Sequence, residues 1–157
     1  MSRRREITMS EPELHRFLQE ERVVTCATLG PNGRPHLMPL WYVADGAVVS
    51  AWTYGVSQKV RNLERLPQAT LQVEAGDRYE ELRGAMLECD VDIVRDPAAL
   101  LEIGIQLARR YYVPEGAAAD AAVLRAAAVQ RGAKRVGLRF RPTRIVTWDH
   151  RKLHGGH

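Results

Sequence analysis

Short runs of apolar and β-branched residues recur along the chain, and polar turn signals separate them. Runs of this kind predict β-strands. Pro31-Asn32-Gly33 and Asp45-Gly46 join the first three runs by short turns, which predicts an antiparallel meander. Pro142 marks a bend between the last two runs. The predicted strands are residues 23–29, 36–43, 47–53, 69–75, 82–94, 135–142 and 143–149.

Helical patterns interrupt the strands at four places. The first helix is predicted to begin at Ser10, an N-cap residue with Glu13 in the capping-box position. A short amphipathic helix follows Ser57 and ends before Pro67. Apolar residues at helical spacing predict a helix from Asp96 to Arg110, and the alanine-rich residues 117–130 have a high helix propensity.

This order of elements predicts a mainly β fold. We expect six to seven antiparallel strands with inserted helices, in a closed or split barrel, because closure removes exposed strand edges. At 157 residues the chain is most simply one domain, residues 1–157, and we expect residues 1–9 and 151–157 to be flexible.

Charge and cysteine content narrow the class of protein. The net charge of +4 does not indicate nucleic-acid binding, because Arg3, Arg4 and Arg5 supply most of the surplus and other basic residues are interleaved with acids. Cys26 and Cys89 match neither a metal signature nor a disulfide framework, and they favour a reducing compartment. No apolar run approaches a membrane span. We expect a cytoplasmic protein without a metal site or a membrane or nucleic-acid partner.

The helix after Ser57 contains a candidate anion site. Lys59 and Arg61 lie in its first turn, where the positive end of the helix dipole disfavours cations. A bound phosphate would make both cations favourable, and Ser57 and Asn62 add donors to the unpaired backbone N–H groups. A solvated basic helix face that pairs with Glu64 fits the spacing equally well.

Two tryptophans lie close to this helix in the sequence. Trp52 is in the strand directly before it, and Trp41 is in a sister strand whose Pro39 cannot donate a ladder hydrogen bond. An open sheet face at this point would hold a flat ring, with a phosphate end on the helix. Core packing is the alternative for each tryptophan.

The order and spacing of these motifs resemble the split β-barrel family of pyridoxamine 5′-phosphate oxidase-like proteins, and in particular its branch of F420-dependent enzymes. The resemblance runs from about residue 15 to residue 153. The motifs that carry it are Gly33-x-Pro35-x-x-x-Pro39-Leu40-Trp41-Tyr42, Asp45-Gly46, Ser57-x-Lys59-x-x-Asn62-Leu63, Pro67, Tyr79-Glu80-x-Leu82-Arg83-Gly84 and Trp148-Asp149-His150-Arg151-Lys152-Leu153.

The resemblance implies a homodimer with two cofactor sites between the subunits. It implies that Ser57 and Lys59 hold the phosphate of a flavin or of the deazaflavin coenzyme F420. The residues that it implies for the ring system are Met38, Pro39, Leu40, Trp52 and Thr53.

The residue before the lysine bears on the choice of cofactor. FMN-using members of the family usually have a basic residue there, whereas this chain has Gln58, which we include among the predicted cofactor-binding residues. This difference favours F420, whose longer tail carries a phosphodiester and carboxylates, and Arg61 is a candidate for the missing charge. FMN is the alternative cofactor.

With F420 bound, the expected function is hydride transfer between the reduced deazaflavin and a small organic substrate. An FMN-dependent oxidoreductase and a non-enzymatic binder of flavin or haem are the alternatives. The sequence identifies no catalytic residue, which agrees with a reaction whose reactive atom belongs to the cofactor.

Other polar residues are interpreted as structural or surface groups. Asp149-His150 lacks an identifiable nucleophile as partner, and His154-x-x-His157 lies in a Gly-Gly tail. His36 lies beside the proposed ring site, where a surface strand residue is the favoured interpretation and a contact with substrate is the alternative. Arg83 is compatible with a cofactor or partner contact and with a cross-strand salt bridge. Residues 109–112 read as the solvated end of a helix.

Overall fold

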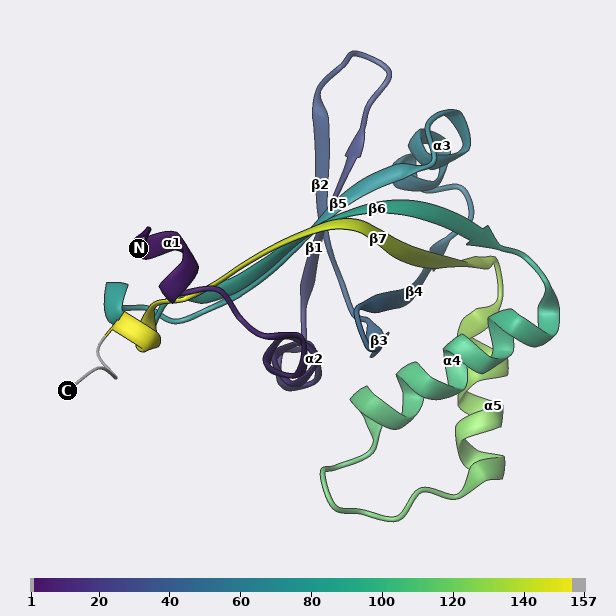
Figure 1. Cartoon of the computed structure of the whole chain (residues 1–157). Helices are drawn as coiled ribbons and strands as arrows, with labels where there is room; N and C mark the ends of the chain where they lie inside the picture. The colour runs from purple at the N-terminus through teal and green to yellow at the C-terminus, as the bar shows by residue number, and fades with distance from the viewer. Residues whose placement is uncertain (1, 154–157) are drawn as a thin grey trace.

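The computed structural model describes residues 2–153 and contains one curled, seven-stranded antiparallel sheet (Figure 1). Its strand order is β2-β1-β5-β6-β7-β4-β3. This half-barrel confirms the predicted split-barrel class and the predicted number of strands. The strands are β1 (Val24–Leu29), β2 (Pro35–Leu40), β3 (Val43–Asp45), β4 (Val48–Tyr54), β5 (Gln68–Ala75), β6 (Arg83–Val94) and β7 (Arg135–Asp149).

The predicted meander of the first three strands is wrong. β2 pairs only with β1 and lies at one edge of the sheet, whereas β3 and β4 form a hairpin at the other edge. The predicted strand 36–43 breaks after Leu40 because Tyr42 is held outside the ladder. Its backbone N–H donates to the Tyr111 hydroxyl at 3.0 Å, and its own buried hydroxyl donates to the Leu18 carbonyl at 2.7 Å.

The two predicted closing strands are one continuous strand, β7. The ladder between β6 and β7 shifts register between Glu88 and Cys89, so that Arg144 pairs with Glu88, Pro142 pairs with Cys89 and Thr143 is the extra residue. A proline is tolerated beside a bulge of this kind, because the local ladder is already interrupted. Pro142 therefore bends the ribbon without ending the strand.

The barrel core is formed by alternate residues of the strands and by helix α2 (Glu11–Glu20). α2 begins as predicted, with a capping box in which the Ser10 hydroxyl accepts from the Glu13 N–H and the Glu13 carboxylate accepts from the Ser10 N–H. Its buried face consists of Leu14, Phe17 and Leu18. These side chains pack on the inner face of the sheet and close one side of the barrel.

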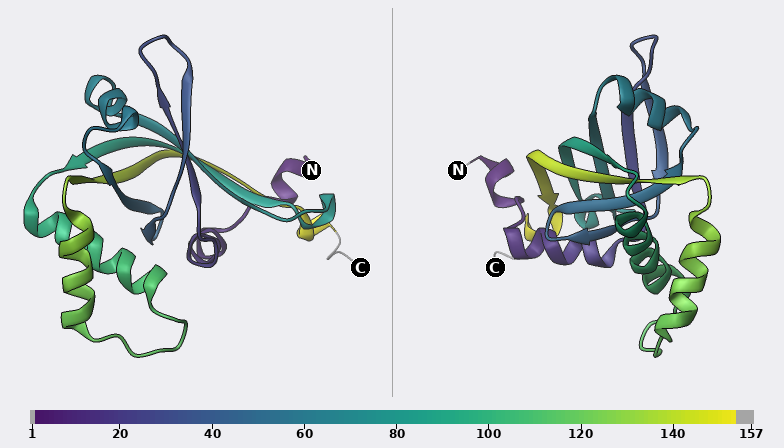
Figure 2. Two further views of the ribbon diagram at one scale, coloured as in Figure 1. Left: turned by 180° about the vertical axis from the view of Figure 1, so that it is seen from behind. Right: turned by 90° about the vertical axis from the view of Figure 1, so that its right-hand side faces the viewer.

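Helices α4 (Pro97–Tyr112) and α5 (Ala121–Gly132) pack together outside the barrel, at the end remote from both termini (Figure 2). The predicted solvated helix end at residues 109–112 is wrong for Arg110. Its guanidinium donates to carbonyls at the C-terminal end of α2, because that end lacks intrahelical partners for its carbonyl groups. α4 and α2 are thereby joined.

The short elements near the termini lie at the far end of the β6–β7 ribbon. They are α1 (Arg3–Glu6), η1 (Tyr79–Glu81) and η2 (His150–Leu153). The segment after α1 contacts β7, where the Asp149 N–H donates to the Ile7 carbonyl at 2.7 Å and the Met9 N–H donates to Thr147 Oγ1 at 2.9 Å. His154 and His157 lie outside the described residues. None of the helices within residues 2–153 is long and apolar enough to cross a membrane.

Candidate functional site

Helix α3 (Gln58–Arg65) places the candidate anion site between β4 and β1. It begins three residues after Gly55, and Ser57 is its N-cap with an extended backbone. The Ser57 hydroxyl makes no cap hydrogen bond. Its Oγ is buried and has no hydrogen-bond partner in the described part of the chain. A buried hydroxyl without a partner costs free energy, so this atom is available for a bound acceptor or donor.

Lys59 is buried, with 7% of its surface exposed. Its ammonium donates to Thr53 Oγ1 on β4 at 3.0 Å, and no carboxylate of residues 2–153 lies within ion-pairing distance of it. Burial lowers the pKa of this ammonium. The nearby Cys26 thiol does not compensate the charge, because burial raises its pKa to about 12 and keeps it neutral.

Asn62 and Gln58 have partners within the protein. Asn62 is fully buried, its amide donates to Thr28 Oγ1 at 3.0 Å, and its carbonyl oxygen accepts from the Gln58 amide at 2.9 Å. These contacts fix α3 against β1. Both residues were predicted to bind cofactor directly. Their side chains brace the helix, and their direct contact with a ligand stays a prediction. Arg61 is exposed at the same helix end.

His36 is a candidate site residue, although the sequence favoured a surface position for it. It pairs with Thr28 across the β1–β2 ladder, so the two side chains share one face of the sheet. His36 is only partly exposed, and its Nδ1 is buried without a hydrogen-bond partner among residues 2–153. Because Thr28 binds Asn62 of α3, the imidazole lies beside the same polar network. Only the pairing of β1 with β2, which places His36 opposite Thr28, reveals that the imidazole lies there.

The residues predicted to line a ring are spread over two strands and both sheet faces. On β2, Met38 and Pro39 are exposed and point to opposite faces, whereas Leu40 is buried. On β4, Trp52 and Thr53 also point to opposite faces. Thr53 faces Lys59, and the contact of these five residues with a cofactor ring stays a prediction.

Both tryptophans contact helix α4. Trp52 packs against α4 so closely that a Cβ at Gly104 would lie 2.4 Å from its Cζ3. Trp41 stacks on Tyr111 near the end of α4, with ring centroids 4.6 Å apart and planes inclined by 5°. Core packing therefore accounts for Trp52, and stacking on a helix accounts for Trp41.

The remaining candidates are structural in the described residues. The Asp149 carboxylate binds the Arg151 guanidinium at 2.7 and 2.9 Å, while His150 Nδ1 lies 2.9 Å from the Tyr79 carbonyl, so the two neighbours form no dyad. Arg83 forms salt bridges with Glu20 of α2 at 3.0 Å and with the C-cap residue Glu21 at 3.7 Å. No group of three metal-ligating side chains occurs in residues 2–153.

The curled antiparallel sheet and the polar start of α3 define a split-barrel protein. The sequence model described as "Pyridoxamine 5′-phosphate oxidase" matches residues 10–149. The chain therefore belongs to the pyridoxamine 5′-phosphate oxidase family, whose split barrels bind flavins. No curated protein sequence matches it significantly.

Solved structures agree with this membership. Conserved hypothetical protein Rv2991 from Mycobacterium tuberculosis is 38% identical, with 97% of this chain and 92% of that chain covered and a TM-score of 0.86. An F420 reductase is 26% identical, with 83% of this chain and 94% of that chain covered and a TM-score of 0.61. HutZ, the haem storage protein from Vibrio cholerae, is 18% identical, with 87% of this chain and 94% of that chain covered. It shares the fold with a TM-score of 0.66.

Proposed function

We propose that this protein is a cytoplasmic, F420-dependent oxidoreductase that transfers a hydride between the reduced deazaflavin and a small organic substrate. The observation that carries the proposal is the buried Lys59 ammonium, which has a hydroxyl partner but no carboxylate among the described residues. A buried, uncompensated charge costs several kcal/mol. An anionic cofactor tail would offset that cost.

The residues around Lys59 fit such a tail. Ser57 Oγ and His36 Nδ1 are buried without partners in residues 2–153, so a phosphate oxygen would satisfy polar atoms that the protein leaves unpaired. The unpaired backbone N–H groups at the start of α3 lie at the positive end of the helix dipole, and both features favour a bound anion there. Arg61, exposed in the same first turn, supplies a further positive charge for a longer acidic tail.

F420 is preferred to FMN for two reasons. Gln58 brings no charge to the position before Lys59, and its amide is already engaged by Asn62 at 2.9 Å. One structural relative at 26% identity is an F420 reductase. FMN remains the second candidate, because flavin binding is general in the family. A non-enzymatic binder of haem or flavin is the third candidate, because the haem storage protein shares only the fold with this chain.

When bound, the deazaflavin or flavin supplies the ring atom that gives or accepts the hydride. The protein's part is to bind and orient it. Lys59, Ser57 and the start of α3 hold the acidic tail, and Asn62 keeps α3 in place on β1 through Thr28. No side chain of the described site has the arrangement of an acid–base pair, so we assign no catalytic residue.

The proposal includes a homodimer with the cofactor between subunits. Exposed apolar residues at the β1–β2 edge support it, since Leu37 is 58% and Leu29 is 42% exposed on the same face of the sheet. Large apolar side chains that gather on a surface often mark an interface. Light scattering measures the oligomeric state, and a monomer that still binds one cofactor would remove this part of the proposal.

Titration with F420, FMN and haem tests the cofactor assignment. We expect F420 to bind more tightly than FMN or haem, and reduced F420 to be oxidised by at least one member of an acceptor panel. Replacing Lys59 by alanine is expected to weaken F420 binding about ten- to a hundred-fold, because a charge-assisted contact is lost. Lys134→Ala, at an exposed lysine, is the matched control. Unchanged affinity in the Lys59 variant would refute the anion site.

A further inference from the structure

Strand β7 has a free edge at the mouth of the half-barrel. β6 pairs with β7 along its length, but β4 pairs with it only as far as Phe140, which faces Val49. Residues 141–149 therefore have a partner strand on one side only, within the described chain. The N-terminal segment reaches this edge near its end, where Asp149 donates to the Ile7 carbonyl.

That contact identifies which backbone groups face the edge. In a strand, the N–H and C=O groups of alternate residues point to the same side. Because the Asp149 N–H points to the free edge, those of Thr147 and Ile145 do so too. Thr147 also accepts a hydrogen bond from Met9 through its side chain. The N–H and C=O groups of Ile145 have no backbone partner on this side in residues 2–153.

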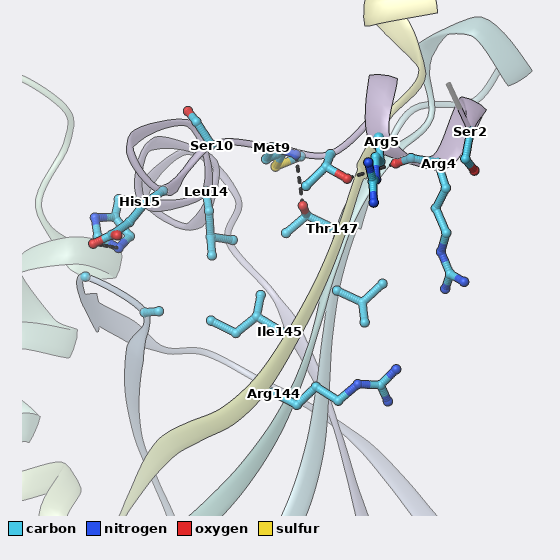
Figure 3. A pocket seen from close by; sticks show the side chains of 15 residues that line it. Ser2, Arg4, Arg5, Met9, Ser10, Leu14, His15, Arg144, Ile145 and Thr147 are labelled. Carbon is cyan, nitrogen blue, oxygen red and sulfur yellow. Dashed lines mark hydrogen bonds and ion pairs between the residues drawn. The ribbon is translucent and has the colours of Figure 1, made fainter.

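A cavity of about 940 Å³ surrounds this edge (Figure 3). On one side of β7 lie apolar groups: Ile145, which is 41% exposed, and Leu14 of α2. On the other side lie the guanidinium groups of Arg4 and Arg144. The cavity thus presents a strand edge between an apolar wall and a cationic wall.

The cationic wall has a surplus of positive charge. Arg4 and Arg5 have no carboxylate within ion-pairing distance among the described residues, and Arg144 has a solvent-exposed partner in Glu88 at 3.2 Å. Glu11 is the one acid among the residues that line the cavity, and it lies 3.9 Å from His15. An incoming ligand with negative charge would be attracted to this wall.

We propose that the free edge of β7 at Ile145, next to the N-terminal segment that contacts Thr147, binds a short extended peptide that alternates acidic and apolar residues. Such a peptide adds one strand to the sheet, so its backbone satisfies the open N–H and C=O groups. Successive side chains of a strand point to opposite faces. The apolar ones then meet Ile145 and Leu14, and the acidic ones meet Arg4 and Arg144.

A second copy of this chain fits the edge less well. The strand most available for exchange is the edge strand β2, but Pro35 and Pro39 remove two of its backbone donors. β2 also contains no acidic residue to pair with the arginines. The surface is separate from α3, so the inference does not depend on the proposed cofactor.

Fluorescence anisotropy with the full-length protein and a labelled peptide of alternating glutamate and valine tests the proposal. We expect saturable binding that falls about tenfold or more when Arg4→Glu and Arg5→Glu are combined, because like charges then face each other. Arg125→Glu, an exposed change on α5, is the matched control and should leave binding intact. Thermal unfolding of each variant verifies that it is folded.

Two further probes separate strand addition from simple charge attraction. The same peptide with N-methylated backbone amides, and one with lysine in place of glutamate, should each bind at least about tenfold more weakly. Equal binding of the N-methylated peptide, or no binding of the parent peptide below about 1 mM, would overturn the proposal. It would also be overturned if reversal of Arg4 and Arg5 dissociated a dimer, because a second copy would then occupy the edge.

Discussion

The Lys59 ammonium lies 3.0 Å from the Thr53 hydroxyl, in a position with 7% exposure and no acidic partner in the described chain. A neutral hydroxyl accepts one of the three ammonium donors but does not neutralise its charge. Burial accordingly lowers the lysine pKa. The protein therefore keeps a charge that weakens the unliganded fold, as expected at a site that binds an anion.

Replacing Lys59 by methionine should separate stability from binding. Methionine keeps the apolar stem and removes the buried charge, so we expect the free energy of unfolding at neutral pH to stay within about 1 kcal/mol of the parent or to rise. F420 or FMN binding should fall about ten- to a hundred-fold. Urea unfolding and cofactor titration measure the two effects, and a variant that is strongly destabilised but binds normally would show that Lys59 is structural.

The pH dependence of the parent protein should follow from the same charge. The folded state lowers the pKa of Lys59 from its ordinary value of 10.5, so it disfavours the protonated form relative to the unfolded chain. The penalty is complete at pH values below the lowered folded pKa. It is relieved as pH rises from that value to 10.5. Stability of the parent relative to Lys59→Met should therefore increase over this alkaline interval, as measured by urea unfolding, and parallel curves would contradict this assignment.

Alanine at Ser57 should mainly weaken cofactor binding, whereas alanine at Asn62 should mainly lower the stability of the fold. Ser57 Oγ has no partner within residues 2–153, so Ser57→Ala is expected to change the free energy of unfolding by less than about 0.5 kcal/mol. It should weaken cofactor binding several-fold, since a hydrogen bond to a phosphate is lost. Asn62→Ala breaks the contact with Thr28 and should cost about 1–3 kcal/mol of stability. Equal stability losses in the two variants would refute this division of roles.

Much of the fold was predictable because its signals are local. The capping box at Ser10 and Glu13 and the alternation along β4 and β5 depend on neighbouring residues, and each appears where expected. The errors concern distant contacts. The strand containing Leu40 stops because Tyr42 is bound by α2 and α4, and the place of β2 in the sheet depends on pairing that no local pattern specifies.

The candidate site shows the same limit. A cation in the first turn of α3 was visible in the sequence, so Lys59 was identified. The burial of its ammonium was not, because that depends on the approach of Thr53 from β4. His36 lies beside the candidate site through its register with Thr28, and Trp52 packs closely against Gly104 of α4. Both depend on residues far away in the chain.

Arg110 should be important for stability because it connects two helices. Its guanidinium lies 2.5 Å from the Tyr42 carbonyl and also donates to the carbonyls of Leu18, Gln19 and Glu21. Arg110→Met keeps the stem but leaves these partly buried carbonyls without a donor, so we expect a loss of about 1.5–3 kcal/mol in urea unfolding. Arg109→Met, at an exposed neighbour, is the control. If both variants lost the same amount, the helix connection would not be the cause.

Asp149 should make stability depend on acidic pH. The hydrogen bonds from Arg151 hold the pKa of this carboxyl below its ordinary value of 3.8. A lowered folded pKa means that the stabilisation is complete above pH 3.8. It is lost as the pH falls from 3.8 through the folded pKa. Because Arg151 is half exposed, solvent screening limits the contribution to about 1 kcal/mol. Asp149→Asn should remove it, so that the variant is less stable at pH 7 and its stability falls less steeply below pH 4.

Asp92→Asn, in the exposed pair with Arg141, should have a smaller effect on the same acid unfolding curve. A larger effect at Asp92 would mean that the protected position of Asp149 does not strengthen its ion pair.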